Sequence, residues 1–448
     1  MEDFELSGDK NSPREPSFKI FIDEKTKYQS ILGLGYSFEH TSCYNLMKMK
    51  KENRRKVLEL LVDPIKGAGM NLWRLCIGTP DFTYEFYTYD DLPEGDEDLE
   101  LKHFSIEKDK ECIIPVVKEA QEINPDLILF ASPWSPPGWM KGSTKKMKGK
   151  KPRTDVDCKG MCGGRLLTKY YDVYSDYLIK FIKSYEDLGI PIYAITVQNE
   201  PGHNWYQMPT CKWTGEEERD FIKKFLGPKL EKEGLKTKIW CFDFNFGLLK
   251  RAQYPEIVLS DPDAAKFVDG VAFHGYDMNR PKFMGETHEL FPSKEMHFTE
   301  GSVRWLWGAS RVIDYFKNWS SSYVGWVPFI DTEGNPNIGP FKTTYTFIQF
   351  LAPEEKYPIE SIIVHADYYY TAHFSKFIQK GAYRVKSTGK TPRGVSEVSF
   401  LNPDGTLVSI IVNRGRKGKM PAINWKNYSM SFNLPGRSIA TFKWKNEK

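Results

Sequence analysis

Short apolar runs bounded by turn residues recur along the first two thirds of the chain. Runs of four to eight apolar or β-branched residues are typical of buried parallel strands. Eight such runs occur, at Ile31–Phe38, Asn71–Ile77, Leu127–Pro133, Ile192–Gln198, Lys238–Phe242, Gly270–Tyr276, Met296–Thr299 and Tyr323–Phe329. Amphipathic stretches separate them, such as Tyr170 to Tyr185, where aromatic residues recur at helical spacing. Eight alternations of strand and helix predict an α/β fold, a closed (β/α)8 TIM barrel.

The pattern changes near residue 367, where short alternating strands and turns replace the apolar runs. Polar and apolar residues alternate in Val395–Phe400, Leu407–Val412 and Ser438–Trp444, with a turn at Asn402–Gly405. This pattern is typical of an all-β sandwich, and Phe18–Ile22 alternates in the same way. We therefore expect residues 1–30 to contribute a strand to the sandwich, residues 31–366 to form the barrel, and residues 367–448 to complete the sandwich.

The composition is that of a folded protein with nearly balanced charge. A chain of 448 residues that is 40% hydrophobic and 15% aromatic has enough material for a large core, which excludes intrinsic disorder. The net charge of +4 depends on seven cations between Lys141 and Arg153, so it does not indicate a nucleic-acid partner. The sequence as written has no secretory signal and predicts a cytoplasmic protein; secretion is the alternative if the start is trimmed.

Two charged loops follow strands at the end of the barrel where active sites form. Asp90–Glu100 carries seven acids, and Lys141–Arg153 carries seven bases. One interpretation is two solvated loops; the other is that they shape substrate access, with the basic loop attracting anionic lipid at a membrane surface.

Cofactor and metal motifs are missing from the sequence. A disulfide between Cys158 and Cys162 is one possibility, while their C-x3-C spacing supplies only two of the roughly four ligands of a zinc site. Neither a P-loop nor a complete dinucleotide-binding motif nor His-Glu-x-x-His occurs, so we expect neither a cofactor nor a metal.

Two glutamates close apolar runs at the predicted barrel mouth. Glu200 follows the fourth run and Glu300 the seventh. Either glutamate alone is as consistent with a salt-bridge partner as with a catalytic group. Two glutamates that face each other across a barrel mouth, however, are what glycosidic cleavage requires. One protonates the leaving oxygen, and the other attacks the anomeric carbon or activates water. A distance near 5 Å between the two carboxyl groups predicts retention of configuration, and a distance of about 6.5–9.5 Å predicts inversion. The sequence does not decide between the two.

Other strand ends supply the side chains of a sugar pocket. Aromatic faces suit the C–H faces of a sugar ring, and amides or charged groups bind its hydroxyls. The candidates are Arg74, Trp134, Asn199, His274, Tyr276, Trp326 and Phe329. Arg74 beside one glutamate would lower the pKa of that glutamate and keep it ionised as the nucleophile, whereas the acid/base needs a raised pKa.

The motifs around these residues resemble glycoside hydrolase family 30. They include Thr196–Pro201, Phe298–Glu300, Asn71–Arg74, Asp81-Phe82, Ala131–Pro136, His274–Tyr276 and Val324–Trp326, and the resemblance runs from about Gly33 to the C-terminus. It implies a retaining β-glycosidase with Glu200 as acid/base, Glu300 as nucleophile and no cofactor. Asn199 matches the family asparagine at the sugar 2-hydroxyl. In the family's glucosylceramidases the substrate is a β-glucoside of ceramide, cleaved with help from an activator protein and anionic lipid.

The chain departs from the family pattern in the part that binds sugar. His40, with Glu39 beside it, stands where the family has a sugar-binding aspartate, and Phe329 replaces a second tryptophan. The expected glycone is therefore glucose by default, with xylose, fucose and galactose as alternatives. An endo-acting β-1,6-glucanase or xylanase is the alternative within the family, and a carbohydrate-binding protein without catalysis is the alternative outside the enzyme class.

Overall fold

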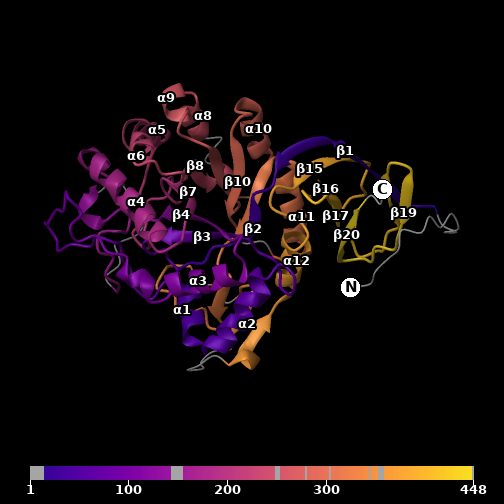
Figure 1. Ribbon diagram of the computed structural model, residues 1–448, viewed down its shortest axis with the longest axis horizontal. Helices are drawn as coiled ribbons and strands as arrows, with labels where there is room; N and C mark the ends of the chain where they lie inside the picture. Colours follow the sequence, from indigo (N-terminus) through magenta and orange to yellow (C-terminus); the bar gives the residue numbers. More distant parts are fainter. Residues whose placement is uncertain are drawn as a thin grey trace.

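A computed structural model describes residues 15–142, 155–247, 253–277, 280–301, 304–341, 343, 345–351 and 358–445. Figure 1 shows a barrel of parallel strands ringed by helices, with a smaller β-sheet unit packed at its side. None of the helices in these ranges is long and apolar enough to cross a membrane.

Eight parallel strands form the barrel, in the order β2-β11-β10-β9-β8-β7-β4-β3. They are β2 (Gly33–Tyr36), β3 (Leu72–Ile77), β4 (Ile128–Pro133), β7 (Ile192–Thr196), β8 (Lys238–Asn245), β9 (Gly270–His274), β10 (Glu295–Glu300) and β11 (Ser320–Gly325). The ring closes where Ser37 forms a parallel bridge with Arg74, and the N–H of Phe38 donates to the carbonyl of Arg74 (2.8 Å). The predicted (β/α)8 barrel is therefore confirmed.

Helices cover the outside of the barrel. They are α1 (His40–Lys48), α2 (Lys51–Val62), α3 (Ile113–Ile123), α4 (Tyr171–Glu186), α5 (Gly215–Phe221), α6 (Gly227–Lys232), α8 (Tyr254–Leu259), α9 (Pro262–Ala265), α10 (Lys282–Leu290) and α11 (Trp305–Lys317). In α4 the aromatic residues that recur at helical spacing are buried against the barrel, as the sequence pattern predicts.

The eighth barrel strand differs from its prediction. The apolar run Tyr323–Phe329 predicts one strand, but β11 spans Ser320–Gly325, so it begins before this run and ends before Phe329. Phe329 begins β12 (Phe329–Asp331), which pairs with β13 (Ile348–Phe350) and β14 (Ile362–Val364) in a separate small sheet. The strand begins with three buried serines. Because these residues are polar, the pattern of apolar residues predicted a later start.

The second unit is a seven-stranded sheet in the order β19-β18-β1-β15-β16-β17-β20. Its strands are β1 (Phe18–Ser30), β15 (Tyr383–Thr388), β16 (Val395–Leu401), β17 (Thr406–Asn413), β18 (Pro421–Trp425), β19 (Tyr428–Ser431) and β20 (Ser438–Lys445). Trp425 of β18 and Trp444 of β20 lie 6.1 Å apart although several strands separate them in the sheet order. The two ends of the sheet therefore fold over a shared apolar core, which gives the predicted β-sandwich its two layers.

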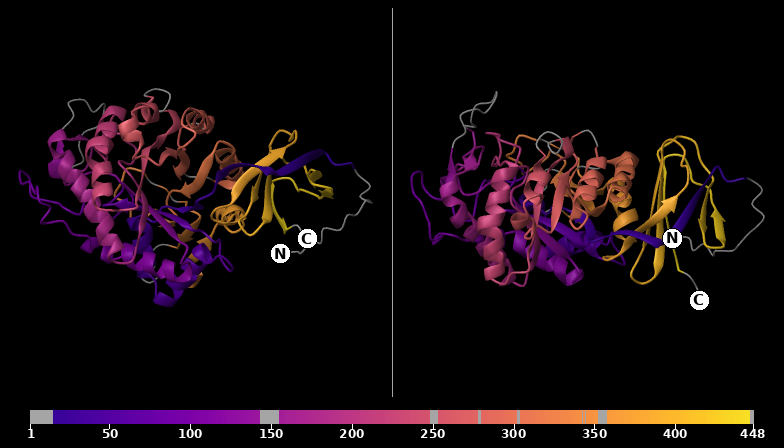
Figure 2. Two further views of the ribbon diagram at one scale, coloured as in Figure 1. Left: turned by 45° about the horizontal axis from the view of Figure 1, so that its top comes forward. Right: turned by 90° about the horizontal axis from the view of Figure 1, so that it is seen from above.

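Strands from both ends of the chain meet in this sandwich. β1 pairs with β18 on one side and with β15 on the other, as the indigo strand among yellow strands in Figure 2 shows. A helix that the alternation did not predict, α12 (Ala366–Ser375), precedes the sandwich strands. The sandwich packs on α11 of the barrel through Phe316 against Phe400 (5.3 Å) and a hydrogen bond between Ser310 and Ser396 (2.5 Å).

Candidate active site

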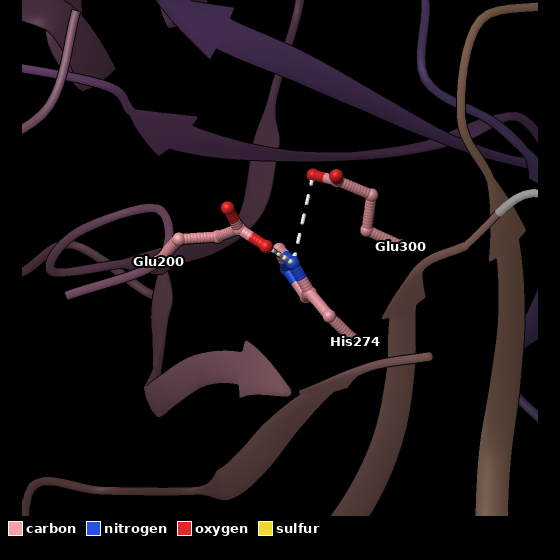
Figure 3. Close-up of side chains that lie close together, drawn as sticks. All are labelled: Glu200, His274 and Glu300. Atoms are coloured by element: carbon pink, nitrogen blue, oxygen red, sulfur yellow. Dashed lines mark hydrogen bonds and ion pairs between the residues drawn. The ribbon is translucent and has the colours of Figure 1, made fainter. Parts of the chain in front are cut away.

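The two glutamates lie together at the carboxyl end of the barrel strands. Glu300 is the last residue of β10, and Glu200 follows β7 in a turn where its backbone is left-handed (φ 50°). His274, the last residue of β9, stands between them (Figure 3). One oxygen from each carboxylate and a nitrogen of His274 all lie within 4.8 Å of one another. The structure thus brings the predicted acid pair into one buried cluster.

Arg74 of β3 organises the nucleophile side of this cluster. Its guanidinium contacts the Glu300 carboxylate and also donates to Asn199 Oδ1 and Asp243 Oδ2, both at 2.8 Å. Tyr276 donates its hydroxyl to Glu300 Oε1 (2.9 Å). Burial works against the charge of Arg74, but Asp243 and Glu300 outweigh it and raise the pKa of Arg74. Arg74 is therefore a permanent cation beside Glu300.

His274 is a second buried cation. Its Nδ1 donates to Glu200 Oε1 (3.1 Å) and its Nε2 donates to Asp243 Oδ1 (3.0 Å). Burial alone would lower the pKa of His274, but Glu300 and Asp243 raise it to about 10. The imidazole thus stays protonated while its two N–H groups fix Glu200 and Asp243.

A histidine that the sequence analysis did not select completes the cluster. His203 Nδ1 lies 2.6 Å from Glu200 Oε2, on the side of Glu200 opposite to His274. Burial favours the neutral form of Glu200, but His203 and then His274 lower its pKa to about 2. Burial raises the pKa of Glu300, against the opposing effects of His274 and Arg74.

The order of the two glutamate pKa values is therefore the reverse of the expectation that Arg74 would keep Glu300 low and leave Glu200 high. The physical reason is His203, which faces only the acid/base candidate.

A cavity of about 440 Å³ opens above the cluster. Of the predicted sugar-binding residues, four line it: Trp134, Asn199, Tyr276 and Trp326. The rings of Trp134 and Trp326 stack at 5.2 Å and form an aromatic wall. Arg74 and His274 lie below this wall and act on the glutamates.

The remaining three predicted pocket residues are buried away from the cavity. Glu39 caps α1, where its carboxylate accepts from the N–H and hydroxyl of Ser42 (2.9 and 2.7 Å). His40 lies in the first turn of α1 with Nδ1 2.5 Å from Thr83 Oγ1. Phe329 stacks on Phe350 (5.5 Å) inside the small sheet. Helix capping and core packing occupy these side chains. The structure therefore contradicts the prediction that they line the sugar pocket.

Several cavity residues were not selected from the sequence. Asp81, four residues beyond β3, is a buried acid whose pKa is raised to about 8 by burial and then by Glu300. The others include Phe82, His203, Trp205, Met208, Arg304 and Phe341. The sequence indicated Asp81 and Phe82 because they are part of the family motif. No sequence pattern indicated the other residues, which lie on loops from distant segments.

The acidic loop forms ion pairs with lysines that follow the basic stretch. Lys159 lies 3.4 Å from Asp91 and Lys169 lies 2.9 Å from Glu97, so cations beside the basic stretch pair with the acidic loop. Lys141 donates to Ser135 Oγ and to two carbonyls, while residues 143–154 lie outside the described part of the chain. The expected lipid contact falls mostly on these residues. Nearby, Cys158 and Cys162 form a disulfide.

Within the described residues, one group, Glu200, His274 and Glu300, brings three potential metal ligands together. A metal needs a neutral imidazole nitrogen, but both nitrogens of His274 donate to carboxylates and its pKa is raised to about 10. Arg74 also supplies positive charge at Glu300. The donor set fits proton transfer rather than metal binding.

Two family models match the chain. The model "Glycosyl hydrolase family 30 TIM-barrel domain" matches residues 31–378, and "Glycosyl hydrolase family 30 beta sandwich domain" matches residues 381–442. The chain is 31% identical to "Putative glucosylceramidase 1" of Caenorhabditis elegans, over 94% of this chain and 82% of that protein. It is 29% identical to "Endo-1,6-beta-D-glucanase" of Neurospora crassa, over 89% of this chain and 82% of that one.

A solved structure shares the whole architecture. "The endo-beta1,6-glucanase BT3312" is 30% identical, with a TM-score of 0.86 over 96% of this chain and 94% of that chain. The barrel and the sandwich agree with these matches, and the chain belongs to glycosyl hydrolase family 30, a family of glycosidases.

Proposed function

We propose that the protein is a retaining β-glucosidase that uses Glu300 as nucleophile and Glu200 as acid/base. One observation carries the proposal: an oxygen of each carboxylate lies within 4.8 Å of the other. Carboxyl groups about 5–5.5 Å apart leave no room for an attacking water between them and suit direct attack by one carboxylate. A wider gap would have supported inversion.

The two roles follow from the neighbours of each glutamate. Glu300 is held by Arg74 and by the hydroxyl of Tyr276, donors that stabilise its carboxylate and orient an oxygen toward the sugar. Glu200 contacts His274, which stays protonated, and the partly exposed imidazole of His203, a side chain of the kind that takes part in proton exchange. Fixed charge therefore supports nucleophile chemistry at Glu300, and proton exchange supports acid/base chemistry at Glu200.

The chemistry has two steps. Glu300 attacks the anomeric carbon as Glu200 gives its proton to the glycosidic oxygen, so the aglycone leaves as an alcohol and the sugar becomes an ester of Glu300. Water then attacks the same carbon, Glu200 takes the proton of that water, and the ester bond to Glu300 breaks. Asn199 accepts a hydrogen bond from Arg74 and lines the cavity, which supports a role in binding a sugar hydroxyl beside the reacting carbon.

Glucose is the glycone that we propose. Both named kinds of relative, glucosylceramidase and endo-1,6-β-D-glucanase, take their names from a substrate containing glucose. The stacked wall of Trp134 and Trp326 and the buried carboxyl group of Asp81 offer a flat apolar face and a hydrogen-bonding partner for a hydroxyl, which suit a glucose ring. An exo-acting enzyme on β-glucosides, including glucosylceramide-type substrates, is the first candidate.

An endo-acting β-1,6-glucanase is the second candidate. The similarity to a solved endo-β1,6-glucanase over nearly all of both chains favours it. Trp205 and Phe341 line the cavity and are exposed, with their rings 5.3 Å apart, so a further sugar of a polymer has an aromatic surface to stack on.

A substrate panel tests the proposal and separates the two candidates. Purified protein is incubated with 4-nitrophenyl β-glycosides, glucosylceramide micelles and a linear β-1,6-glucan, and early products are followed by NMR. Retention predicts that the first sugar released is the β-anomer; release of the α-anomer would reject the assignment of Glu300 as nucleophile. Glucose alone supports exo action, whereas oligosaccharides from the glucan support endo action. Trapping with a 2-deoxy-2-fluoro-β-glucoside should label Glu300, and Glu300→Gln is the matched unlabelled control.

A further inference from the structure

We propose that Asp243 is a positioning residue that holds the acid/base and the nucleophile in their relative places, through Arg74 on one oxygen of its carboxylate and His274 on the other. The inference rests on the proposed roles of Glu200 and Glu300, and it gives Asp243 no contact with the substrate.

The side chain of Asp243 lies beneath the cavity rather than in it. It has no exposed surface, and the side chains of its two cationic partners, Arg74 and His274, have none either. Of the described residues, those that line the cavity include neither Asp243 nor these two partners. Asp243 can therefore affect the reaction only through the groups that separate it from the sugar.

Each oxygen of the Asp243 carboxylate holds one of the two cations. Oδ2 accepts a hydrogen bond from Arg74 Nη2 (2.8 Å), and Oδ1 accepts one from His274 Nε2 (3.0 Å). The same guanidinium contacts the carboxylate of Glu300, and the same imidazole donates from Nδ1 to Glu200 (3.1 Å). Two short chains of contacts thus start at Asp243, and each ends on one of the two glutamates.

Hydroxyl groups from the barrel strands fix the direction of this carboxylate. Thr196 Oγ1 and Ser132 Oγ lie 2.8 and 3.0 Å from Oδ2, and the hydroxyl of Thr299 donates to Oδ1 (2.8 Å). These residues belong to β7, β4 and β10. A carboxylate that is held on both oxygens cannot rotate without breaking several of these contacts, so its two cations stay in fixed places.

The backbone of Asp243 supports the same arrangement. Phe242 and Phe244 of β8 pair with two consecutive residues of β9, which leaves Asp243 as the extra residue of a β-bulge. Its backbone is left-handed (φ 48°), a sparsely populated conformation for a residue other than glycine. Its carbonyl accepts a hydrogen bond from the N–H of Glu200 (3.0 Å), so the main chain of the acid/base is also tied to Asp243.

The charges of the buried cluster balance only when Asp243 is included. Burial opposes its ionisation, but Arg74 and then His274 lower the pKa of Asp243, so it stays a carboxylate. His274 also faces Glu200 at Oε1 (3.1 Å) and Glu300 at Oε2 (3.8 Å). When Glu200 carries the proton that it gives to the leaving oxygen, two carboxylates remain against two cations. Without the charge of Asp243 this state would contain an unpaired buried cation, which is unfavourable.

The Asp243→Asn variant tests this role. The amide keeps the shape of the side chain, but it turns an NH2 group toward Arg74 or His274, both of which are donors, so one of the two chains of contacts must break. We expect kcat on the β-glucosides of the panel to fall by about 100-fold or more, because small misplacements of reacting groups have effects of this size. KM should change much less, since Asp243 lies outside the cavity.

Glu119→Gln is the matched control. Glu119 of α3 is buried and pairs with Arg54 of α2 (2.7 Å), so the same change of carboxylate to amide breaks another ion pair, one that does not border the cavity. Both variants should lower the melting temperature. Only Asp243→Asn should lower kcat per folded molecule.

The ring of His274 gives a readout that a loss of stability alone would not change. Burial would lower the pKa of His274, and Glu300 and Asp243 raise it to about 10. Removing the charge of Asp243 should therefore lower this pKa, by about one unit or more, in an NMR titration of the histidine rings of Asp243→Asn. In the wild type near neutral pH, both ring nitrogens of His274 should carry a proton.

Three results would each overturn the inference. The first is a kcat in Asp243→Asn that falls no further than the folded fraction does, and the second is an unchanged pKa of His274 in that variant. The third needs no variant and decides the case if Asp243→Asn does not fold: a single protonated ring nitrogen on His274 in the wild type near neutral pH. Failure of the wild type to hydrolyse any glycoside of the panel would instead reject the proposed function, and it would leave the NMR result unaffected.

Discussion

Asp109 and Glu300 are both buried carboxylates of the barrel unit, but their partners differ in charge. Asp109, in the 3-10 helix Glu107–Lys110, accepts hydrogen bonds from three tyrosine hydroxyls, those of Tyr87 (2.7 Å), Tyr89 (2.6 Å) and Tyr185. Glu300 is held by a guanidinium and a phenol and lines the cavity. Within the described chain, no cation pairs with Asp109, and it does not line the cavity.

The difference separates a carboxylate that stabilises the fold from one that reacts. Burial raises the pKa of Asp109, and hydrogen bonds from Tyr185, Tyr89 and Tyr87 lower it. The net pKa is about 6, so these neutral donors do not fully offset the effect of burial. These tyrosines come from the loop after β3 and from α4, so the cluster ties distant segments to one acid. Cations and exchangeable protons, rather than burial alone, distinguish the cluster at the barrel mouth.

The largest expected effect is on Glu300. Glu300→Gln should lower kcat by about four orders of magnitude or more, because an amide does not form the glycosyl ester. Thermal unfolding should change little, since Gln keeps the shape and one acceptor for Tyr276. Activity on β-glycosides and melting temperature are measured together; turnover within tenfold of the wild type would remove Glu300 from the nucleophile role.

The second-largest effect is expected for the Arg74→Lys variant. Lysine keeps the charge but loses the fork that contacts Glu300, Asn199 and Asp243 at once, so the glutamate and the asparagine lose their common anchor. We expect kcat to fall by about 100-fold, as small misplacements of reacting groups do. Lys159→Arg, at a surface ion pair with Asp91, is the matched control and should retain activity. An unchanged kcat in Arg74→Lys would show that charge alone suffices at this position.

Much of the barrel and its acid pair follows from the sequence, because both depend on local pattern. Buried parallel strands read as apolar runs, and the residue that ends each run lies at the mouth, which placed Glu200, Glu300 and His274. His203 lies in a loop whose direction depends on contacts with distant segments, so no local pattern indicates it, and Asp81 is indicated only by the family motif. Glu39 and Phe329 failed for a related reason: a motif position fixes where the chain passes, and packing decides which way its side chain points.

Asp109→Ala should act on stability and leave the chemistry unchanged. The three tyrosine hydroxyls would lose their acceptor inside the protein, which should lower the free energy of unfolding by about 3 kcal/mol. Denaturant unfolding measures the loss, and kcat on the folded fraction should stay near the wild-type value. A fall in kcat larger than the fall in the folded population would contradict the separation of the two clusters.

The smallest expected effects come from removing one tyrosine hydroxyl from each cluster. Tyr276→Phe takes one donor from Glu300, and Tyr185→Phe takes one donor from Asp109. Because the phenol of Tyr276 borders the cavity, its loss should lower kcat by about tenfold, equal to about 1.4 kcal/mol of transition-state stabilisation, with little change in unfolding. Tyr185→Phe should lower the free energy of unfolding by about 1 kcal/mol with kcat unchanged, because Asp109 keeps two donors. Effects of the same kind in both variants would mean that a shared network, rather than separate clusters, links the two acids.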